Sequence, residues 1–394
     1  MNTLESEFAR RSWRSLLKRC GPTFLSHELY KGRRLRFVST LCGNVRDFVL
    51  SSLSSELGEI DPVAASQFLN RFPTVTRRCD DDIYDDPFAA EAYAFLHLVE
   101  RYRRFWDVLE VLLRSGDLPV RDAPLDVIDV GTGPAPALFA VNDFYQELRK
   151  FAAGDAGCGQ LETPAPRLRS IESSVSMVRM VHHLAERTGR PGPFGPDSTD
   201  FSGFDPPQTR ALMRSRMIDE LINYNDYSEE EARIQAHLDQ SAWQSEARFH
   251  IVIFSNFLTS VKRVQDLAEE LRHVFRNLKP RGLVIVVGGT GGKYPLVYEA
   301  VDRIASSAKV HRVRGLPERV RCKYDNAEAI AVKQLYTSVC GRLRQVVPTV
   351  APVAAGKSMR DVWDPDAPLR GPRAFGIRVY RAQNRPPGVR FSTT

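Results

Sequence analysis

The sequence predicts an α/β protein in which a helical N-terminal domain precedes a doubly wound, mostly parallel sheet. The pattern of residues 1–118 is mostly helical and contains no strand followed by a glycine turn. From Leu125 onward, short apolar runs alternate with amphipathic segments, which is typical of strands joined by crossover helices. We therefore expect two domains, 1–118 and 119–394, the second carrying a helical insertion at about 208–247.

The clearest helix of the first domain is predicted at 87–114. Its apolar residues recur at alternating spacings of three and four, which places them on one helix face. Pro87 suits a first helical turn, and Gly116 suits the residue that ends the helix. The apolar face consists of Ala92, Phe95, Val99, Tyr102, Trp106, Leu109 and Leu113.

The second domain begins with a buried strand at 125–130, a glycine turn and a helix at 136–151. Further strands are expected at 169–172, 249–255 and 283–287, and further helices at 175–187, 264–278, 295–308 and 326–344. Residues 375–381 alternate with a period of two and predict a final strand.

Composition is that of an ordinary globular protein, with 43% apolar and 26% charged residues among 394. No apolar run approaches the ~18 residues of a membrane span. The N-terminus lacks the apolar segment of a secretion signal, so we expect a cytoplasmic protein without a membrane partner. The net charge of +7 permits an acidic partner such as RNA but does not require one.

The six cysteines lie far apart and form no CxxC pair and no cysteine–histidine pair with zinc spacing. We therefore expect buried free thiols in place of a disulfide framework, and no metal site.

The glycine turn after the first strand reads DVGTGPAP, a form typical of nucleotide-binding proteins. A dinucleotide fingerprint requires G-x-G-x-x-G, but the third position here is Pro136. Proline lacks an N–H group and would crowd a pyrophosphate, which weakens the case for NAD. Residues 288–294, GGTGGKY, lack the spacing of a phosphate-binding P-loop.

Residues 129–135 resemble the first motif of class I S-adenosylmethionine (SAM)-dependent methyltransferases, D/E-x-G-x-G-x-G/A. Glu172 matches the acidic residue that ends the family's second strand, and a helix follows it. Residues 251–258, IVIFSNFL, resemble the fourth motif, and 277–287 resemble the helix, L-K-P-G-G turn and strand that come next. The ordered set spans about 125–290, and 375–381 could supply the family's antiparallel edge strand.

The sequence departs from the family pattern in three places. Glu172 follows Gly131 at roughly twice the ~20 positions of a compact unit, an excess that an inserted loop at 152–166 can absorb. Asp197 and Asp200 compete for the third motif, and Asp200 is preferred. The fourth motif begins with His250 where an acidic residue is usual, and we interpret His250 as a strand-edge residue.

The resemblance implies a SAM site with assigned roles. Backbone around Gly131 and Gly133 would hold the methionine part, Glu172 the ribose and Asp200 the adenine amine. Asn256 would border the reactive methyl and is the only catalytic candidate. The expected cofactor-binding residues are Asp129, Gly131, Thr132, Gly133, Pro134, Glu172, Ser173, Asp200, Ser255 and Asn256.

The implied activity is methyl transfer, an in-line displacement for which the protein mainly supplies proximity and alignment. A helical cover fits a small-molecule acceptor, whereas the arginines of 1–118 fit RNA, and both remain open. Residues 255–258 lack the [D/N]-P-P-[Y/F] of base-amine methyltransferases. The alternatives are a catalytically silent SAM-fold protein that binds RNA or serves in assembly and, more remotely, a nicotinamide oxidoreductase. The oligomeric state is open.

Overall fold

The computed structural model describes residues 3–77, 84, 86–154, 158–161, 163–172, 174–187, 249–276, 278–347 and 374–382. The expected insertion at 208–247 lies outside these residues, as do Ser173, Asp197 and Asp200.

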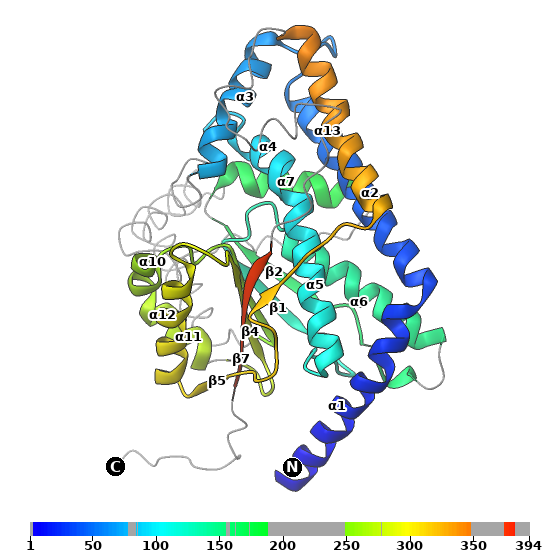
Figure 1. Cartoon of the computed structure of the whole chain (residues 1–394), viewed down its shortest axis with the longest axis vertical. Helices are drawn as coiled ribbons and strands as arrows, with labels where there is room; N and C mark the ends of the chain where they lie inside the picture. Colours follow the sequence, from blue (N-terminus) through cyan, green and yellow to red (C-terminus); the bar gives the residue numbers. More distant parts are fainter. Residues whose placement is uncertain are drawn as a thin grey trace, which may run out of the picture.

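A seven-stranded sheet forms the centre of the described chain, in the order β2-β1-β3-β4-β7-β5, with β6 also paired to β7 (Figure 1). The strands are β1 (Asp126–Val130), β2 (Arg167–Ile171), β3 (Ile251–Ser255), β4 (Leu283–Gly288), β5 (Val310–Arg312), β6 (Arg319–Val320) and β7 (Phe375–Ala382). The first four are parallel, and β7 runs antiparallel to β4. The mostly parallel sheet with an antiparallel final strand is thus confirmed.

The position of the final strand within the sheet corrects one expectation. β7 is not an edge strand, because β5 and β6 pair with it on the side away from β4. These two strands contain only three and two residues. Segments that short carry no periodicity in the sequence, which is why they were not predicted.

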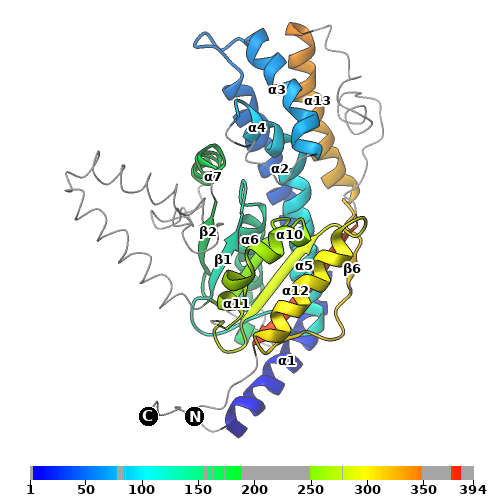
Figure 2. The ribbon, with the colours of Figure 1, turned by 90° about the vertical axis from the view of Figure 1, so that its left-hand side faces the viewer.

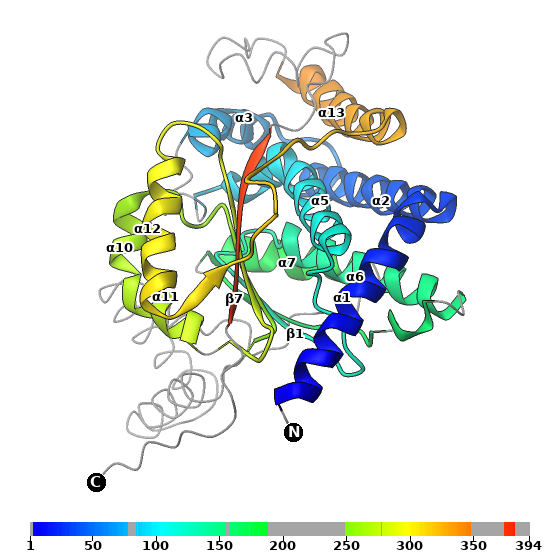
Figure 3. The same ribbon diagram turned by 60° about the horizontal axis from the view of Figure 1, so that its bottom comes forward.

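Helices cover both faces of the sheet, as a doubly wound fold requires. Figure 3 shows α10 (Val261–Asp266), α11 (Ala268–Arg276) and α12 (Tyr294–Ser307) on one side, and α5 (Val99–Ser115) and α6 (Pro136–Gly154) on the other. Val127 and Ile253 face the layer of α5 and α6, whereas Ile128 and Val252 face α10–α12. The single helix predicted at 264–278 is in fact two helices, which meet at Leu267. The remaining helices near β2 are α7 (Val175–Arg187) and a short 3-10 turn (Gly159–Leu161).

The N-terminal part is helical, as expected. It contains α1 (Thr3–Ser26), α2 (Glu28–Ser52), α3 (Pro62–Arg77), α4 (Ala89–Tyr93), the π turn η2 (Ala94–Leu98) and α5 (Val99–Ser115). Every residue of the predicted apolar face is buried, and Gly116 ends α5 in a left-handed conformation. The helix begins at Ala89, after Phe88 with a φ of 62°, and so starts later than Pro87 suggested. Among the described residues, no helix is long and apolar enough to cross a membrane.

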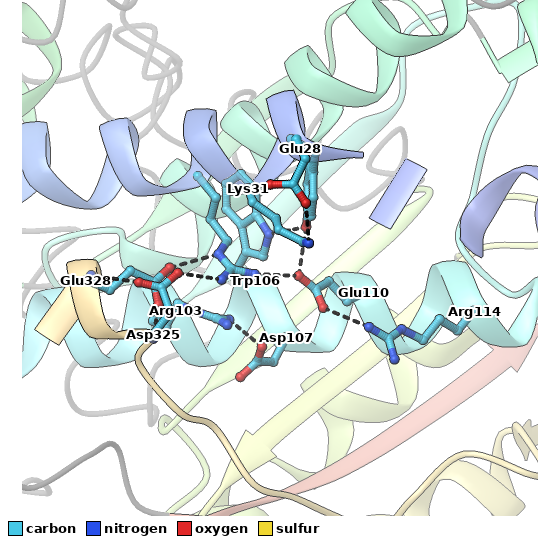
Figure 4. A network of polar contacts seen from close by, with 11 residues as sticks. Glu28, Lys31, Arg103, Trp106, Asp107, Glu110, Arg114, Asp325 and Glu328 are labelled. Atoms are coloured by element: carbon cyan, nitrogen blue, oxygen red, sulfur yellow. Dashed lines mark hydrogen bonds and ion pairs between the residues drawn. The ribbon is translucent and has the colours of Figure 1, made fainter. Parts of the chain in front are cut away.

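A helix from the C-terminal half joins this helical layer: α13 (Asn326–Val346) lies along α2 (Figures 1 and 2). Figure 4 shows the ion pairs that hold it. Glu328 is fully buried and accepts hydrogen bonds from Arg34 (2.8 Å) and Arg103 (3.3 Å). Glu328 also forms a capping box with Asp325 at the start of α13. The helical layer is therefore built from both ends of the chain, and the domain boundaries remain a prediction.

The cysteines behave differently from the expectation of free thiols throughout. Cys20 and Cys158 form a disulfide with a Cα–Cα distance of 6.0 Å. The partners are distant in sequence but meet because Phe24 of α1 packs against Phe144 and Phe151 of α6. Within the described chain, the buried thiols of Cys42, Cys322 and Cys340 are free, as expected.

Candidate functional site

The predicted site residues that the structure describes gather at one edge of the sheet, where the carboxyl ends of β1, β2 and β3 meet. β1 pairs with β2 on one side and with β3 on the other. The turn at 131–135 follows β1 and leads into α6. In open α/β sheets, ligands bind outside the carboxyl ends of the strands. Asp129, the glycine turn and Glu172 lie at this edge, where Ser255 ends the neighbouring β3 and Asn256 follows it.

Backbone hydrogen bonds fix the glycine turn against β2. The N–H groups of Gly131 and Thr132 both donate to the carbonyl oxygen of Ile171, at 2.8 and 3.1 Å. Gly131 and Gly133 have φ values of 63° and 56°, a left-handed conformation that glycine adopts at little cost. The turn therefore favours glycine at both positions because of its backbone conformation. Pro134, which follows Gly133, is buried.

The two glycines face different surroundings. A Cβ atom at Gly131 would overlap the ring of Phe257, which follows β3. That ring also lies under the guanidinium of Arg263, 4.2 Å from its carbon, so the chain's own side chains fill this space. At Gly133 the nearest atoms to such a Cβ belong to Tyr93, at 3.7 Å. A ligand would therefore approach the backbone at Gly133.

The side chain of Glu172 is held in place as a hydrogen-bond acceptor. The residue is only 9% exposed, and its carboxylate accepts the N–H of Gly133 at 2.6 Å and the N–H of Ser174 at 3.1 Å. A carboxylate has about four lone-pair positions and can accept several hydrogen bonds at once. The geometry fits a diol such as a ribose, held beside the turn.

Asp129 lies fully buried beneath the turn. The hydroxyl of Thr132 donates to its Oδ2 at 2.8 Å, while Oδ1 is buried without a hydrogen-bond partner among the described residues. Burial raises the pKa of Asp129 to about 8; the Thr132 hydrogen bond opposes the shift and the charge of Glu172 adds to it. The carboxyl group is thus mostly protonated at neutral pH.

The backbone of Asn256 has an unusual conformation in the turn after β3. Its φ is 57°, a left-handed conformation that asparagine tolerates better than most residues. Its N–H donates to the carbonyl of Val287 at 2.8 Å, and its amide lies 3.4 Å from the hydroxyl of Ser255. The residue shapes the turn after β3, and its catalytic role remains a prediction.

His250 is poorly placed for acid–base chemistry at this edge. It precedes β3 and therefore lies at the opposite end of the sheet, where its Nδ1 accepts the N–H of Asp126 at 2.9 Å. Burial, together with the charges of Lys279 and Arg121, lowers the pKa of His250 to about 4. The interpretation as a strand-edge residue agrees with this geometry.

Tyr93 is the residue at this edge that the sequence did not single out. It comes from the end of α4, and only the packing of the helical layer brings it to Gly133. Its sequence position beside the predicted apolar face gave no signal, because such a residue normally packs in the core.

The sequence matches no protein-family model and no curated protein. Solved structures similar to this chain include the [4+2]-cyclase SpnF, with 14% identity, coverage of 81% of this chain and 94% of that one, and a TM-score of 0.33. The CcbJ methyltransferase from Streptomyces caelestis is 13% identical, with coverage of 76% of this chain and 95% of that one, and a TM-score of 0.33. A SAM-dependent methyltransferase from Thiobacillus denitrificans, in complex with S-adenosyl-L-homocysteine, is 11% identical. The match covers 72% of this chain and 91% of that one, with a TM-score of 0.33. With identities of 11–14% and TM-scores of 0.33, this similarity establishes neither a ligand nor a reaction for the chain. Function is therefore inferred from the site residues.

Proposed function

We propose that this chain is a SAM-dependent methyltransferase that binds its cofactor at the carboxyl edge of β1, β2 and β3. The observation that carries the proposal is the buried carboxylate of Glu172, held by the N–H of Gly133. An acidic residue ending the second strand, fixed to the glycine turn of the first, matches the paired motifs in the sequence. In this arrangement the carboxylate can accept hydrogen bonds from a ribose that lies beside the glycine turn.

The described residues divide the work of binding. Glu172 accepts hydrogen bonds from the ribose hydroxyls, and the turn at Gly133 lets the ligand approach the backbone closely. The buried Oδ1 of Asp129 offers a further polar group beneath the turn. Bound there, SAM supplies a methyl group that its sulfonium already activates, so alignment is the main task of the protein. Ser173 and Asp200 keep the roles that the resemblance implies.

A small molecule is the acceptor that we favour over RNA. Tyr93 brings the helical layer directly against the glycine turn, and the buried face of α5 packs over α6. A layer placed in this way covers the site and suits an acceptor that can be enclosed. An RNA acceptor and a catalytically silent RNA-binding protein are separate outcomes of the experiments below.

Calorimetric titration with S-adenosylhomocysteine tests cofactor binding. Loss of hydrogen bonds to a charged group costs about 1.5–3 kcal/mol, so Glu172→Gln should weaken binding about 10- to 100-fold. Glu186→Gln is the matched control, because Glu186 is exposed on α7, the helix after Glu172. Failure of the wild-type protein to bind S-adenosylhomocysteine would contradict the proposal.

Transfer of a tritiated methyl group to fractionated cell extract then tests the reaction. We expect label in the small-molecule fraction, and much less of it with Glu172→Gln at the same cofactor concentration. Label in RNA would correct the acceptor. Binding of S-adenosylhomocysteine without transfer to any fraction would favour the silent alternative, in which case RNA binding should weaken steeply with salt.

A further inference from the structure

The hydroxyl group of Tyr93 lies beside Gly133 of the glycine turn. Tyr93 is 5% exposed, and both its hydroxyl and Cε1 lie 3.7 Å from the position of a Cβ at Gly133. Among the described residues not adjacent to Gly133 in the chain, the atoms nearest to that position all belong to Tyr93. A ligand atom beside the Gly133 backbone would therefore lie close to the phenol group of Tyr93.

Arg101 is fixed to the same phenol. Its guanidinium donates a hydrogen bond to the Tyr93 hydroxyl and lies over the Tyr93 ring, 4.7 Å from the centroid. The rings of Tyr84 and His97 meet the Tyr93 ring edge-on, each at 5.3 Å between centroids. These contacts hold both Tyr93 and Arg101 in one orientation.

The π turn η2 explains how residues so far apart along the helix share one side. In an α-helix, residues four apart advance by roughly 40° around the axis, so Tyr93 and Arg101 would diverge. The wider turn of a π-helix offsets this drift, and η2 lies between Tyr93 and Arg101. Single π turns inside α-helices are frequent at functional sites.

The chemistry of this pair selects an anionic oxygen. Because the Tyr93 oxygen accepts a hydrogen bond from Arg101, its own proton is directed to another acceptor, and none is found among the described residues. Arginine and this phenol then both act as donors, and a guanidinium with five N–H groups can serve two acceptors at once. The Arg101 cation already covers a face of the ring, which disfavours a cationic ligand there.

We propose that Tyr93 and Arg101 form a carboxylate-binding site beside Gly133, supplied by the helical layer. The proposal rests on the proposed function for the ligand at the glycine turn. The carboxylate comes either from the amino-acid end of the cofactor or from an acidic acceptor, and these sources share the same chemistry.

Titration calorimetry of Tyr93→Phe and Arg101→Met with three probes separates the sources. S-adenosylhomocysteine carries the amino-acid end, 5′-methylthioadenosine lacks it, and benzoate serves as a minimal acidic acceptor. Arg114→Met is the matched control, because Arg114 lies on the same helix with its side chain 63% exposed. Thermal unfolding checks that each variant is folded, and Tyr93→Phe removes only one oxygen.

If the site holds the cofactor, both variants weaken S-adenosylhomocysteine about tenfold and leave methylthioadenosine unchanged. If it holds an acceptor, benzoate binds the wild-type protein loaded with S-adenosylhomocysteine, and both variants abolish this binding. Variants that bind all three probes as the wild type does would overturn the proposal.

Failure of the proposed function gives a different result, because the wild type then binds neither nucleoside. Benzoate binding to the unloaded protein that both variants abolish would still support the carboxylate site. Absence of binding by any probe would overturn both proposals.

Discussion

The left-handed backbone conformation of Asn256 is by itself a reason for asparagine at this position, apart from any role in catalysis. The resemblance assigns Asn256 to the reactive methyl, but its φ of 57° alone favours asparagine or glycine. A loss of activity on replacing Asn256 by alanine would therefore mix backbone strain with lost contacts. Replacement by glycine, which keeps the backbone conformation, isolates the side chain.

Asp129 makes stability depend on pH in a defined window. Its pKa is about 8 in the folded chain, against about 3.9 for an ordinary aspartate. Between about pH 4 and pH 8 the folded chain holds a proton that the unfolded chain has released. The contribution of Asp129 to the free energy of unfolding therefore falls as pH rises through this window and levels off above it.

Chemical denaturation at pH 5 and pH 8 tests this prediction. The stability of the wild type relative to Asp129→Asn should fall between the two values, because asparagine does not titrate. Parallel pH profiles for the two proteins would show that Asp129 is ionised in the folded chain.

At the scale of elements, burial of Glu328 makes α13 part of the helical layer. Glu328 neutralises Arg34 and Arg103, which come from α2 and α5, and caps its own helix. Removal of one partner from a buried ion pair costs about 3–5 kcal/mol, so Glu328→Gln should lower the free energy of unfolding by about 3 kcal/mol.

Glu318→Gln is the control for that variant, since Glu318 pairs with Arg312 and Arg378 while 60% exposed. Surface pairs contribute little, so denaturant unfolding should show a small change. Equal losses in the two variants would contradict the role of Glu328.

Elements with strong periodicity were predictable from the sequence, and elements defined by tertiary contacts were not. The β1 strand, its glycine turn and α6 follow from local pattern, as do α7 and α12. The strand β5, the π turn η2 and the break at Leu267 depend on packing and leave no periodic signal. At the site, Glu172 was predictable from its place after a strand, whereas Tyr93 reaches Gly133 only through the fold.

At the scale of the whole molecule, contacts distant in sequence assemble the layer over the sheet. α13 follows four strands of the second half yet packs on α2, and Cys20 of α1 is linked to Cys158 beyond α6. Cysteine spacing cannot reveal such a pair, because α1 reaches α6 only in the folded chain. The helical layer that carries Tyr93 is thus assembled from segments of both halves of the chain.

Hydrogen–deuterium exchange with and without S-adenosylhomocysteine tests the central claim most directly. The claim predicts slower exchange in peptides covering 129–135 and 171–178, since the ligand would stabilise the turn and the Glu172 contacts. Exchange in α1 should stay unchanged, because α1 contacts the C-terminal end of α6 through Phe24 and Phe151, whereas the glycine turn precedes the other end of α6. Binding that leaves 129–135 and 171–178 unprotected, or no binding at all, would contradict a cofactor site at the glycine turn.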